Sequence, residues 1–330
     1  MSTVKPSNFA PAETIPELPF PLDHVKDIGW LEGVSYHPLF KALLPVPLLI
    51  IIAVPLYFIA RRFWRAIQQD VARERELDPA KNELDYRPAV CLCLTAVILT
   101  LHEYYGGRGF YETTIRPELQ ALETSGLSFL KVGHFNSLYG YTWWSAARVL
   151  GYVAVPIVIW RVLFPKDPLL DHGLRTEGFI KHLWMYGVML GLILVPMLIV
   201  AQEEDFGSYY PFYKQASRSW FDFLVWEFVY FIQFFALEFF FRGWMLGAMR
   251  RAFGFSAVFV MAVPYCMIHY GKPYLEAHGA IIAGVVLGTL AMRTKSIYGG
   301  FFLHIAVAGL MDTLSLWKDD KLPSQFWPGF

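Results

Sequence analysis

Two charged residues lie inside one of the most apolar stretches of the sequence. Glu238 and Arg242 occur in ALEFFFRGW, residues 236–244, whose other members are apolar side chains and one glycine. A spacing of four residues on a helix places both side chains on one face, one turn apart and within reach of an ion pair. Ionisable groups at membrane depth are costly unless they pair or line water. The pair therefore indicates either a structural ion pair between helices or part of a functional site.

Two histidines in other apolar stretches favour a functional site. His269 ends one stretch, one turn after Tyr265, and His304 lies in the middle of the last stretch. If these stretches converge, the ionisable residues form a polar cavity inside an apolar bundle. We therefore predict Glu238, Arg242, His269 and His304 as catalytic residues. Four further residues are candidate supporting groups: Tyr265, Glu227, Glu276 and Asp312.

Three kinds of chemistry fit these residue types. In the first, Glu238 is a general base that activates water while a histidine donates to the developing oxyanion. In the second, Glu238, His269 and His304 bind zinc, although the sequence has no HExxH motif to favour a metal. In the third, the residues form a proton or ion pathway in a transporter, but no inverted repeat of broken helices supports transport. The residue types alone are compatible with all three.

The composition indicates an integral membrane protein. Of the 330 residues, 55% are hydrophobic and 17% are charged, whereas soluble domains carry about 25% charged residues. The net charge is zero and long basic runs are absent, so we expect a lipid bilayer and no nucleic acid as partner. We predict an all-α, multi-pass transmembrane bundle of about eight spans, at residues 42–60, 88–105, 141–160, 183–201, 220–249, 253–271, 279–292 and 297–317.

The chain divides into three predicted parts. Residues 1–41 are polar and rich in proline, residues 42–205 hold four spans, and residues 206–330 form a core that carries the predicted site. Basic residues gather on alternate loops, at 61–87, 161–181, 250–251 and 293–295. Because cytoplasmic loops are enriched in Lys and Arg, we place these loops in the cytoplasm. Residues 61–87 are predicted to form a solvated, helical cytoplasmic connector.

The motif order resembles that of a known protease family. Glu-x-x-x-Arg-Gly begins at Glu238, aromatic-x-x-x-His ends at His269, and Gly-x-x-x-Gly precedes the last membrane histidine, His304. This order, over about residues 215–317, is similar to the CAAX-protease and bacteriocin-processing (CPBP or Abi) family of intramembrane endopeptidases. The resemblance implies an all-helical membrane protease in which a glutamate and a histidine activate water. It also implies that a second histidine and an asparagine hold the oxyanion, without a metal.

Two positions depart from the family pattern. Leu237 stands where the family usually has the first glutamate of a pair, and Ala308 stands where an asparagine is expected. Asp312 is a candidate replacement for the asparagine, and Glu276 or Glu227 for the missing carboxylate. These two positions predict a divergent member of the CAAX-protease and bacteriocin-processing family with a rearranged site.

With this resemblance we expect an endopeptidase that cleaves a membrane-associated peptide or protein tail without a metal or other cofactor. In this reading Glu238 is the base, Arg242 orients it, His269 shares the proton and His304 polarises the carbonyl. The alternative is a non-catalytic relative that binds a peptide or partner as an immunity or assembly factor. The resemblance also implies a prokaryotic inner membrane.

Overall fold

The described part of the chain is helical, as predicted. The structure is a computed structural model that describes residues 43, 45–78, 85–202, 206–270 and 274–329, so the predicted segment 1–41 lies outside the described residues. Within these ranges the regular structure is helical, and the one β-type pairing is an isolated antiparallel bridge between Leu174 and Ser296. The all-α class is thereby confirmed.

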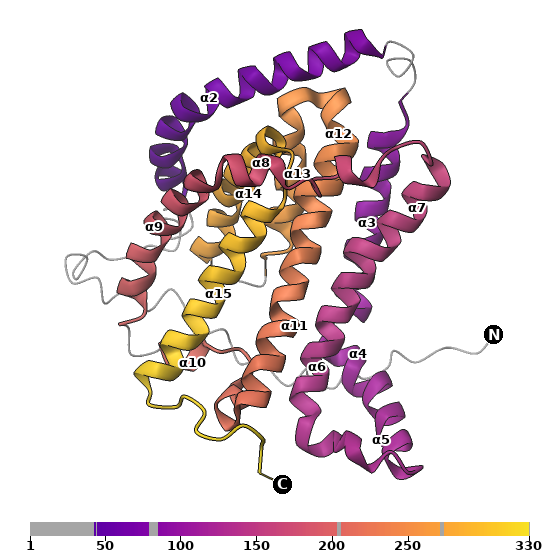
Figure 1. Cartoon of the computed structure of the whole chain (residues 1–330), viewed down its shortest axis with the longest axis vertical. Coiled ribbons are helices and arrows are strands. Elements are labelled where there is room, and N and C mark those ends of the chain that lie inside the picture. Colours follow the sequence, from indigo (N-terminus) through magenta and orange to yellow (C-terminus); the bar gives the residue numbers. More distant parts are fainter. Residues whose placement is uncertain (1–42, 44, 79–84, 203–205, 271–273, 330) are drawn as a thin grey trace.

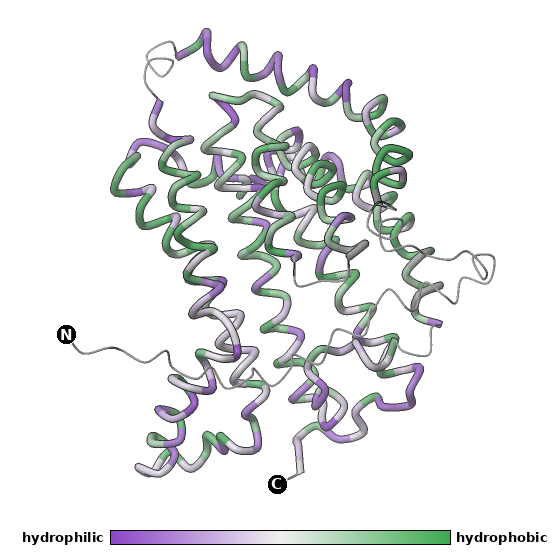
Figure 2. The backbone as a smooth tube through the Cα atoms, turned by 180° about the vertical axis from the view of Figure 1, so that it is seen from behind, coloured by the Kyte–Doolittle hydropathy of each residue, from purple (hydrophilic) through white to green (hydrophobic). Residues whose placement is uncertain are grey.

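Six helices in the described ranges are long and apolar enough to cross a membrane. A shorter apolar helix, Leu183–Val195, adds to them. The six are Val46–Leu77, Arg87–Tyr105, Val132–Leu163, Trp220–Met267, Ala277–Thr294 and Tyr298–Lys318. Figure 2 shows hydrophobic residues along the middle of the bundle and hydrophilic residues gathered towards its ends. The molecule is thus a helical membrane bundle, and the count of eight spans stays a prediction.

The stretch Trp220–Met267 consists of two helical segments joined by a turn. A straight helix of its 48 residues would reach about 72 Å, against a hydrocarbon core of about 30 Å. Helix α11 (Trp220–Glu238) continues through η8 (Phe239–Met245) into α12 (Leu246–Phe253), and the chain turns back at Gly254, where φ is +57°. The returning helix α13 (Ala257–Met267) is shorter than the predicted span 253–271. His269 therefore follows the end of this helix.

Helix α2 (Pro45–Leu77) begins along the side of the bundle and then crosses its end (Figure 1). Its first half exposes apolar side chains, as a lipid-facing helix does. Its second half packs on the bundle: Ile67 and Val71 are fully buried, and Trp64 Nε1 donates to Thr289 Oγ1 at 2.9 Å. The predicted connector is therefore helical as far as Leu77, but it is amphipathic and packed rather than freely solvated, because its apolar face covers the ends of α12 and α14 (Tyr274–Thr294).

The N-terminal helices pack directly on the C-terminal ones. Ser145 Oγ donates to Val229 O on α11 at 2.8 Å, and Tyr186 packs against Gly299. The helices of this half are α3 (Arg87–Tyr105), α4 (Arg108–Phe110), α5 (Arg116–Thr124), α6 (Val132–Val149), α7 (Val155–Leu163), α8 (Glu177–Lys181) and α9 (Leu183–Val200). The short helix α10 (Phe206–Tyr209) precedes α11, and the long helix α15 (Tyr298–Lys318) is the last helix of the chain. The division near residue 205 remains a prediction.

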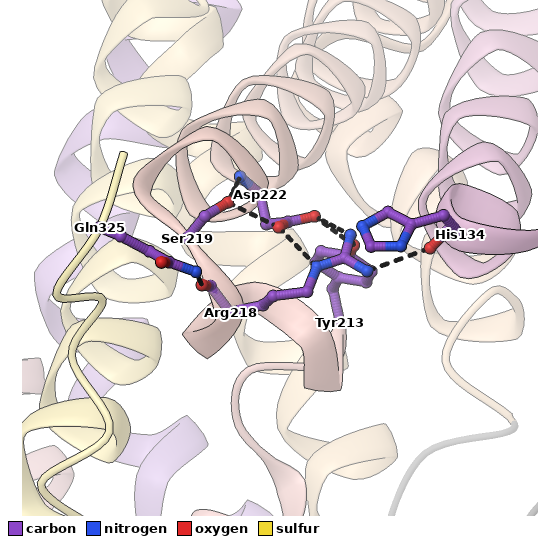
Figure 3. Close-up of polar contacts among 6 residues, drawn as sticks. All are labelled: His134, Tyr213, Arg218, Ser219, Asp222 and Gln325. Atoms are coloured by element: carbon purple, nitrogen blue, oxygen red, sulfur yellow. Dashed lines mark hydrogen bonds and ion pairs between the residues drawn. The ribbon is translucent and has the colours of Figure 1, made fainter. Parts of the chain in front are cut away.

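A polar cluster anchors the first turn of α11 (Figure 3). Ser219 caps the helix by accepting from Asp222 N at 3.1 Å. Arg218 holds the Asp222 carboxylate with two donors, at 2.8 and 2.6 Å, and Tyr213 donates to the same carboxylate at 2.7 Å. Arg218 also donates to His134 O on α6 at 3.1 Å. Asp222 is fully buried, and these contacts fix α11 against α6 as charge-assisted hydrogen bonds do.

The C-terminal tail completes this anchor. The first N–H groups of a helix have no partner within the helix. Here Trp220 N donates to Gln325 O at 3.0 Å and Phe221 N donates to Phe326 O at 2.9 Å. The tail therefore holds the beginning of the helix that carries the predicted site.

Candidate active site

The helix that carries Glu238 and Arg242 changes its winding at the site. Helix α11 ends at Glu238, and the next seven residues, Phe239–Met245, form the π-helix η8. All seven are buried. Single π-helical turns inside α-helices frequently occur at functional sites. The sequence did not reveal this change, because the apolar run gives no signal that distinguishes α- from π-winding.

Aromatic packing holds η8 in place. The Phe240 ring lies 4.6 Å from that of Tyr152 and 5.2 Å from that of Trp244, in stacked arrangements. The Phe241 ring meets the edge of Tyr265 at 5.4 Å. Such pairs add to the stabilisation from burial. Rings of Tyr152, Trp244 and Tyr265 therefore hold the aromatic residues beside Glu238 in fixed positions.

Gly243, the glycine of the Glu-x-x-x-Arg-Gly motif, allows a loop to approach η8. A Cβ at this position would lie 2.4 Å from His172 O, a backbone atom. The same loop accepts a hydrogen bond from Ile297 N at Gly173 O, at 2.9 Å. The loop before α8 therefore joins η8 to the start of α15, which carries His304.

Glu238 contacts a cation and an imidazole with one oxygen. Its Oε1 atom lies 3.2 Å from Arg242 Nη1 and 3.2 Å from His304 Nδ1. The Arg242 and Glu238 side chains are 0% and 1% exposed, whereas the His304 side chain is 22% exposed. The buried Glu238 carboxylate thus contacts a side chain, that of His304, which is itself partly exposed.

The position of the His304 ring assigns its tautomer. Its Nδ1 atom lies between two acceptors, Gly300 O at 3.0 Å and the Glu238 carboxylate. A nitrogen between two acceptors carries the hydrogen, so in the neutral imidazole Nε2 has the free lone pair. The Phe234 ring stacks on the imidazole at 5.1 Å and limits its rotation. His304 is therefore held in a fixed orientation by Nδ1 and by the Phe234 ring, and its Nε2 atom can act as a base.

Gly300 makes room for the carboxylate. A Cβ at this position would lie 2.3 Å from Glu238 Oε2 and 2.8 Å from its carboxyl carbon. Gly300 lies one turn before His304 on α15, so it brings the Glu238 carboxylate against the backbone beside that ring. Sequence reasoning missed this residue, although a glycine four positions before a membrane histidine is a visible signal.

Tyr265 and His269 form the next layer of the site. The Arg242 guanidinium lies 3.7 Å from the centre of the Tyr265 ring, a cation–π contact. The Tyr265 and His269 rings lie 4.8 Å apart, and His269 Nδ1 is 2.8 Å from Tyr265 O. His269 is partly exposed. The structure thus connects Glu238 to His269 through Arg242 and Tyr265.

Asp312 and Glu227 form a separate pair. Asp312 Oδ2 accepts from Trp226 Nε1 at 2.7 Å, and its carboxyl group interacts electrostatically with that of Glu227. Asp312 follows His304 by eight residues, about 12 Å along a helix, and Glu227 precedes Glu238 by eleven, about 16 Å. The expectation that Asp312 stands in for an asparagine beside His304 does not fit this placement. Asp312 lies about two helical turns from His304 and interacts with Glu227 instead.

The two departures from the family pattern lie in apolar surroundings. Leu237 is buried in the main hydrophobic core, and Ala308 is buried among aromatic residues that include Trp226 and Tyr230. Glu276, the third candidate carboxylate, lies on α14, but its side chain is outside the described residues. No replacement for the missing glutamate or asparagine is thus visible beside Glu238 in the described part of the chain.

The zinc alternative gains no support from the geometry. Over the residues that the structure describes, no three His, Cys, Asp or Glu side chains are placed to hold a metal ion. Glu238 and His304 contact each other, whereas His269 is connected through Tyr265.

Comparison with known families agrees with the motif order. Residues 218–310 match the family model described as type II CAAX prenyl endopeptidase Rce1-like. The resemblance to CAAX-processing membrane proteases is thereby confirmed for this segment, which contains Glu238, Arg242, His269 and His304. None of the curated proteins and none of the solved structures compared with the chain matches it.

Proposed function

We propose that the chain is an intramembrane endopeptidase that cleaves a membrane-associated peptide or protein tail with a glutamate- and histidine-activated water. The observation that carries this proposal is the contact of Glu238 with both Arg242 and His304. All three residues lie in the segment that matches the endopeptidase family. The resemblance adds the expectation that the protein resides in a prokaryotic inner membrane.

The geometry favours a division of roles between the two partners. Because Glu238 is 1% exposed and His304 is 22% exposed, His304 Nε2 takes the proton as water attacks the carbonyl carbon. Glu238 stabilises the resulting imidazolium through Nδ1, and Arg242 keeps Glu238 ionised and in place. His304 then gives the proton to the leaving amine nitrogen. This assignment makes Glu238 and Arg242 positioning residues and His304 the catalytic base.

His269 supplies the second histidine that the resemblance implies. It lies beyond the end of α13, partly exposed, with its ring against Tyr265. A donor in this place would hold the oxygen of the carbonyl under attack, which is where negative charge develops. His269 is thus proposed as the oxyanion donor.

The test is peptide cleavage by the full-length protein in proteoliposomes. The family description suggests the probe: a farnesylated peptide with a CAAX end, beside the same peptide without the lipid. We expect cleavage by the wild type, detected by mass spectrometry. We expect kcat to fall about 100-fold or more in Glu238→Gln and His304→Gln. Because Glu238→Gln leaves the buried Arg242 without its carboxylate, its Tm should fall, and circular dichroism at the assay temperature checks that each variant is still folded.

A non-catalytic binding protein is the second candidate. The replacement of two expected polar residues by Leu237 and Ala308, both in apolar surroundings, favours it. This candidate predicts that the wild type binds the lipidated peptide without releasing any product. It also predicts that Glu238→Gln leaves the peptide Kd unchanged. That combination of results would overturn the protease proposal.

A further inference from the structure

A basic cavity lies at the end of the bundle that α2 crosses, where α12 and α14 end (Figure 1). Its volume is about 470 Å³. Side chains reach it from four parts of the chain: α2, the loop at 171–175, η8 with α12, and the end of α14. Five cations line it: Arg175, Arg242, Arg250, Arg251 and Lys295. Two carboxylates, Glu74 and Asp171, accompany them.

The carboxylates do not balance these cations one for one. Glu74 Oε1 serves two of them, Arg250 at 3.1 Å and Lys295 at 3.3 Å. Asp171 pairs with Arg175 at 2.6 Å. Cations that share one carboxylate retain the capacity to bind a further anion.

Buried donors in the cavity lining also lack acceptors. Arg242 uses Nη1 on Glu238, but its Nε and Nη2 atoms have no hydrogen-bond partner among the described residues, and its side chain is 0% exposed. Arg250 Nε is likewise buried without an acceptor in this part of the chain. A buried N–H group without a partner costs the free energy of its desolvation. Anion oxygens placed in the cavity would remove that cost.

We propose that this cavity binds a phosphate group. Guanidinium groups donate parallel hydrogen bonds that match the spacing of phosphate oxygens. Several cations around one cavity also fit a doubly charged phosphomonoester ligand better than they fit a singly charged carboxylate ligand. Arg175 and Lys295, with side chains 45% and 52% exposed, stand at the mouth, and Arg242 is the buried member. The cavity lies at the ends of α2 and α14, two helices long and apolar enough to cross a membrane, and lipid headgroups meet spanning helices at their ends. The source is an anionic lipid headgroup or a soluble phosphate.

The proposal is independent of peptide hydrolysis. Of the cations that line the cavity, Arg242 also holds Glu238 in the proposed reaction, whereas Arg175, Arg250 and Lys295 take no part in it. A protein that binds peptides without cleaving them would retain the cavity and its ligand.

Native mass spectrometry of the full-length protein in detergent tests the lipid source. The probes are phosphatidic acid, which carries a phosphomonoester, and phosphatidylcholine with the same acyl chains. The cavity variant is Arg175→Ala/Lys295→Ala. The matched control is Arg62→Ala/Arg65→Ala, which removes two exposed arginines of α2 that do not line the cavity. We expect phosphatidic acid to bind the cavity variant about tenfold more weakly than it binds the wild type or the control.

Thermal melting with inorganic phosphate tests the soluble source on the same three proteins. A rise in Tm with phosphate that only the cavity variant loses assigns the site to a soluble anion, and a cavity-dependent lipid adduct assigns it to a headgroup. Either result supports a phosphate site. If neither the lipid adduct nor the Tm rise differs between the cavity variant and the control, the proposal is overturned. Equal binding of phosphatidylcholine and phosphatidic acid to the wild type also overturns a lipid headgroup site.

Discussion

At the scale of single residues, the site is organised around one carboxylate. Glu238 is held by a guanidinium on its own helix, by an imidazole on α15, and against a glycine backbone of α15. Removing one partner of a buried ion pair leaves an uncompensated charge, which is strongly destabilising. Substitutions that displace the carboxylate without removing a charge are therefore the more informative tests.

Gly300→Ala is such a substitution. The new Cβ would lie 2.3 Å from Glu238 Oε2, so the carboxylate must move away from the backbone beside His304. We expect peptide cleavage to fall about 10- to 100-fold, since small displacements of catalytic groups have effects of this size. The free energy of unfolding should fall by about 1–3 kcal/mol. Cleavage kinetics and chemical denaturation measure the two effects.

Gly279→Ala is the control for Gly300→Ala. A Cβ at Gly279 on α14 meets no atom within 4 Å, so this variant should keep both activity and stability. Wild-type activity in Gly300→Ala would contradict the placement of Glu238 against α15.

Asp312→Asn tests whether the pair formed by Asp312 and Glu227 takes part in the reaction proposed around Glu238. Because Asp312 contacts Glu227 and Trp226 rather than His304, an amide at this position should leave kcat within about threefold of the wild type, well short of the loss expected for a group that acts in the reaction. The amide oxygen can still accept from Trp226, so the fold should persist. Cleavage of the lipidated peptide measures the effect. A loss as large as that of Glu238→Gln would return Asp312 to the reaction.

At the scale of elements, the π-helix and the loop that covers it position the site. Gly243 allows the loop with His172 to pack on η8, and Gly173 binds the start of α15. His172 itself is buried, and neither ring nitrogen has a hydrogen-bond partner within the described residues. Burial therefore lowers the pKa of His172 below its ordinary value of 6.5.

This lowered pKa predicts a pH dependence of stability. The unfolded chain binds a proton at His172 at a higher pH than the folded protein does, so stability is lost as pH falls below about 6.5. Each unit by which the pKa is lowered corresponds to about 1.4 kcal/mol. His172→Leu removes the titrating group and should flatten Tm between pH 7.5 and 5.5. Differential scanning calorimetry of both proteins measures this difference, and parallel Tm profiles would contradict it.

At the scale of the whole molecule, the basic loops meet at one end. Glu74, Arg175, Arg250 and Lys295 come from four separate segments, yet they line one cavity. The predicted cytoplasmic loops thus share a side of the bundle. Helices α4 and α5 lie at the opposite end (Figure 1).

Cysteine labelling in intact cells tests this arrangement. In a chain whose three cysteines, Cys91, Cys93 and Cys266, are replaced by alanine, Lys295→Cys should be shielded from an impermeant maleimide. Glu118→Cys on α5 should react with it, because the charge rule places the basic end in the cytoplasm. The reverse pattern would invert the topology. Labelling of both positions would place the two ends on one side.

Much of the fold was predictable because apolar runs of membrane length form helices wherever they occur. The all-α class and the approximate positions of α3, α9, α14 and α15 followed from such runs. The early end of α13 and the packing of α2 across the bundle did not follow, because a reversal and an amphipathic face depend on what lies beside them.

The sequence alone determined which residues are candidates for chemistry and which neighbours on one helix can touch. The contact between Glu238 and Arg242, four residues apart, is of this local kind. Only the tertiary structure decided that His304 meets Glu238 and that Asp312 meets Glu227 instead. Contacts between helices depend on the depth and rotation of each helix, which are set by packing at sites such as Gly300 rather than by spacing along the chain.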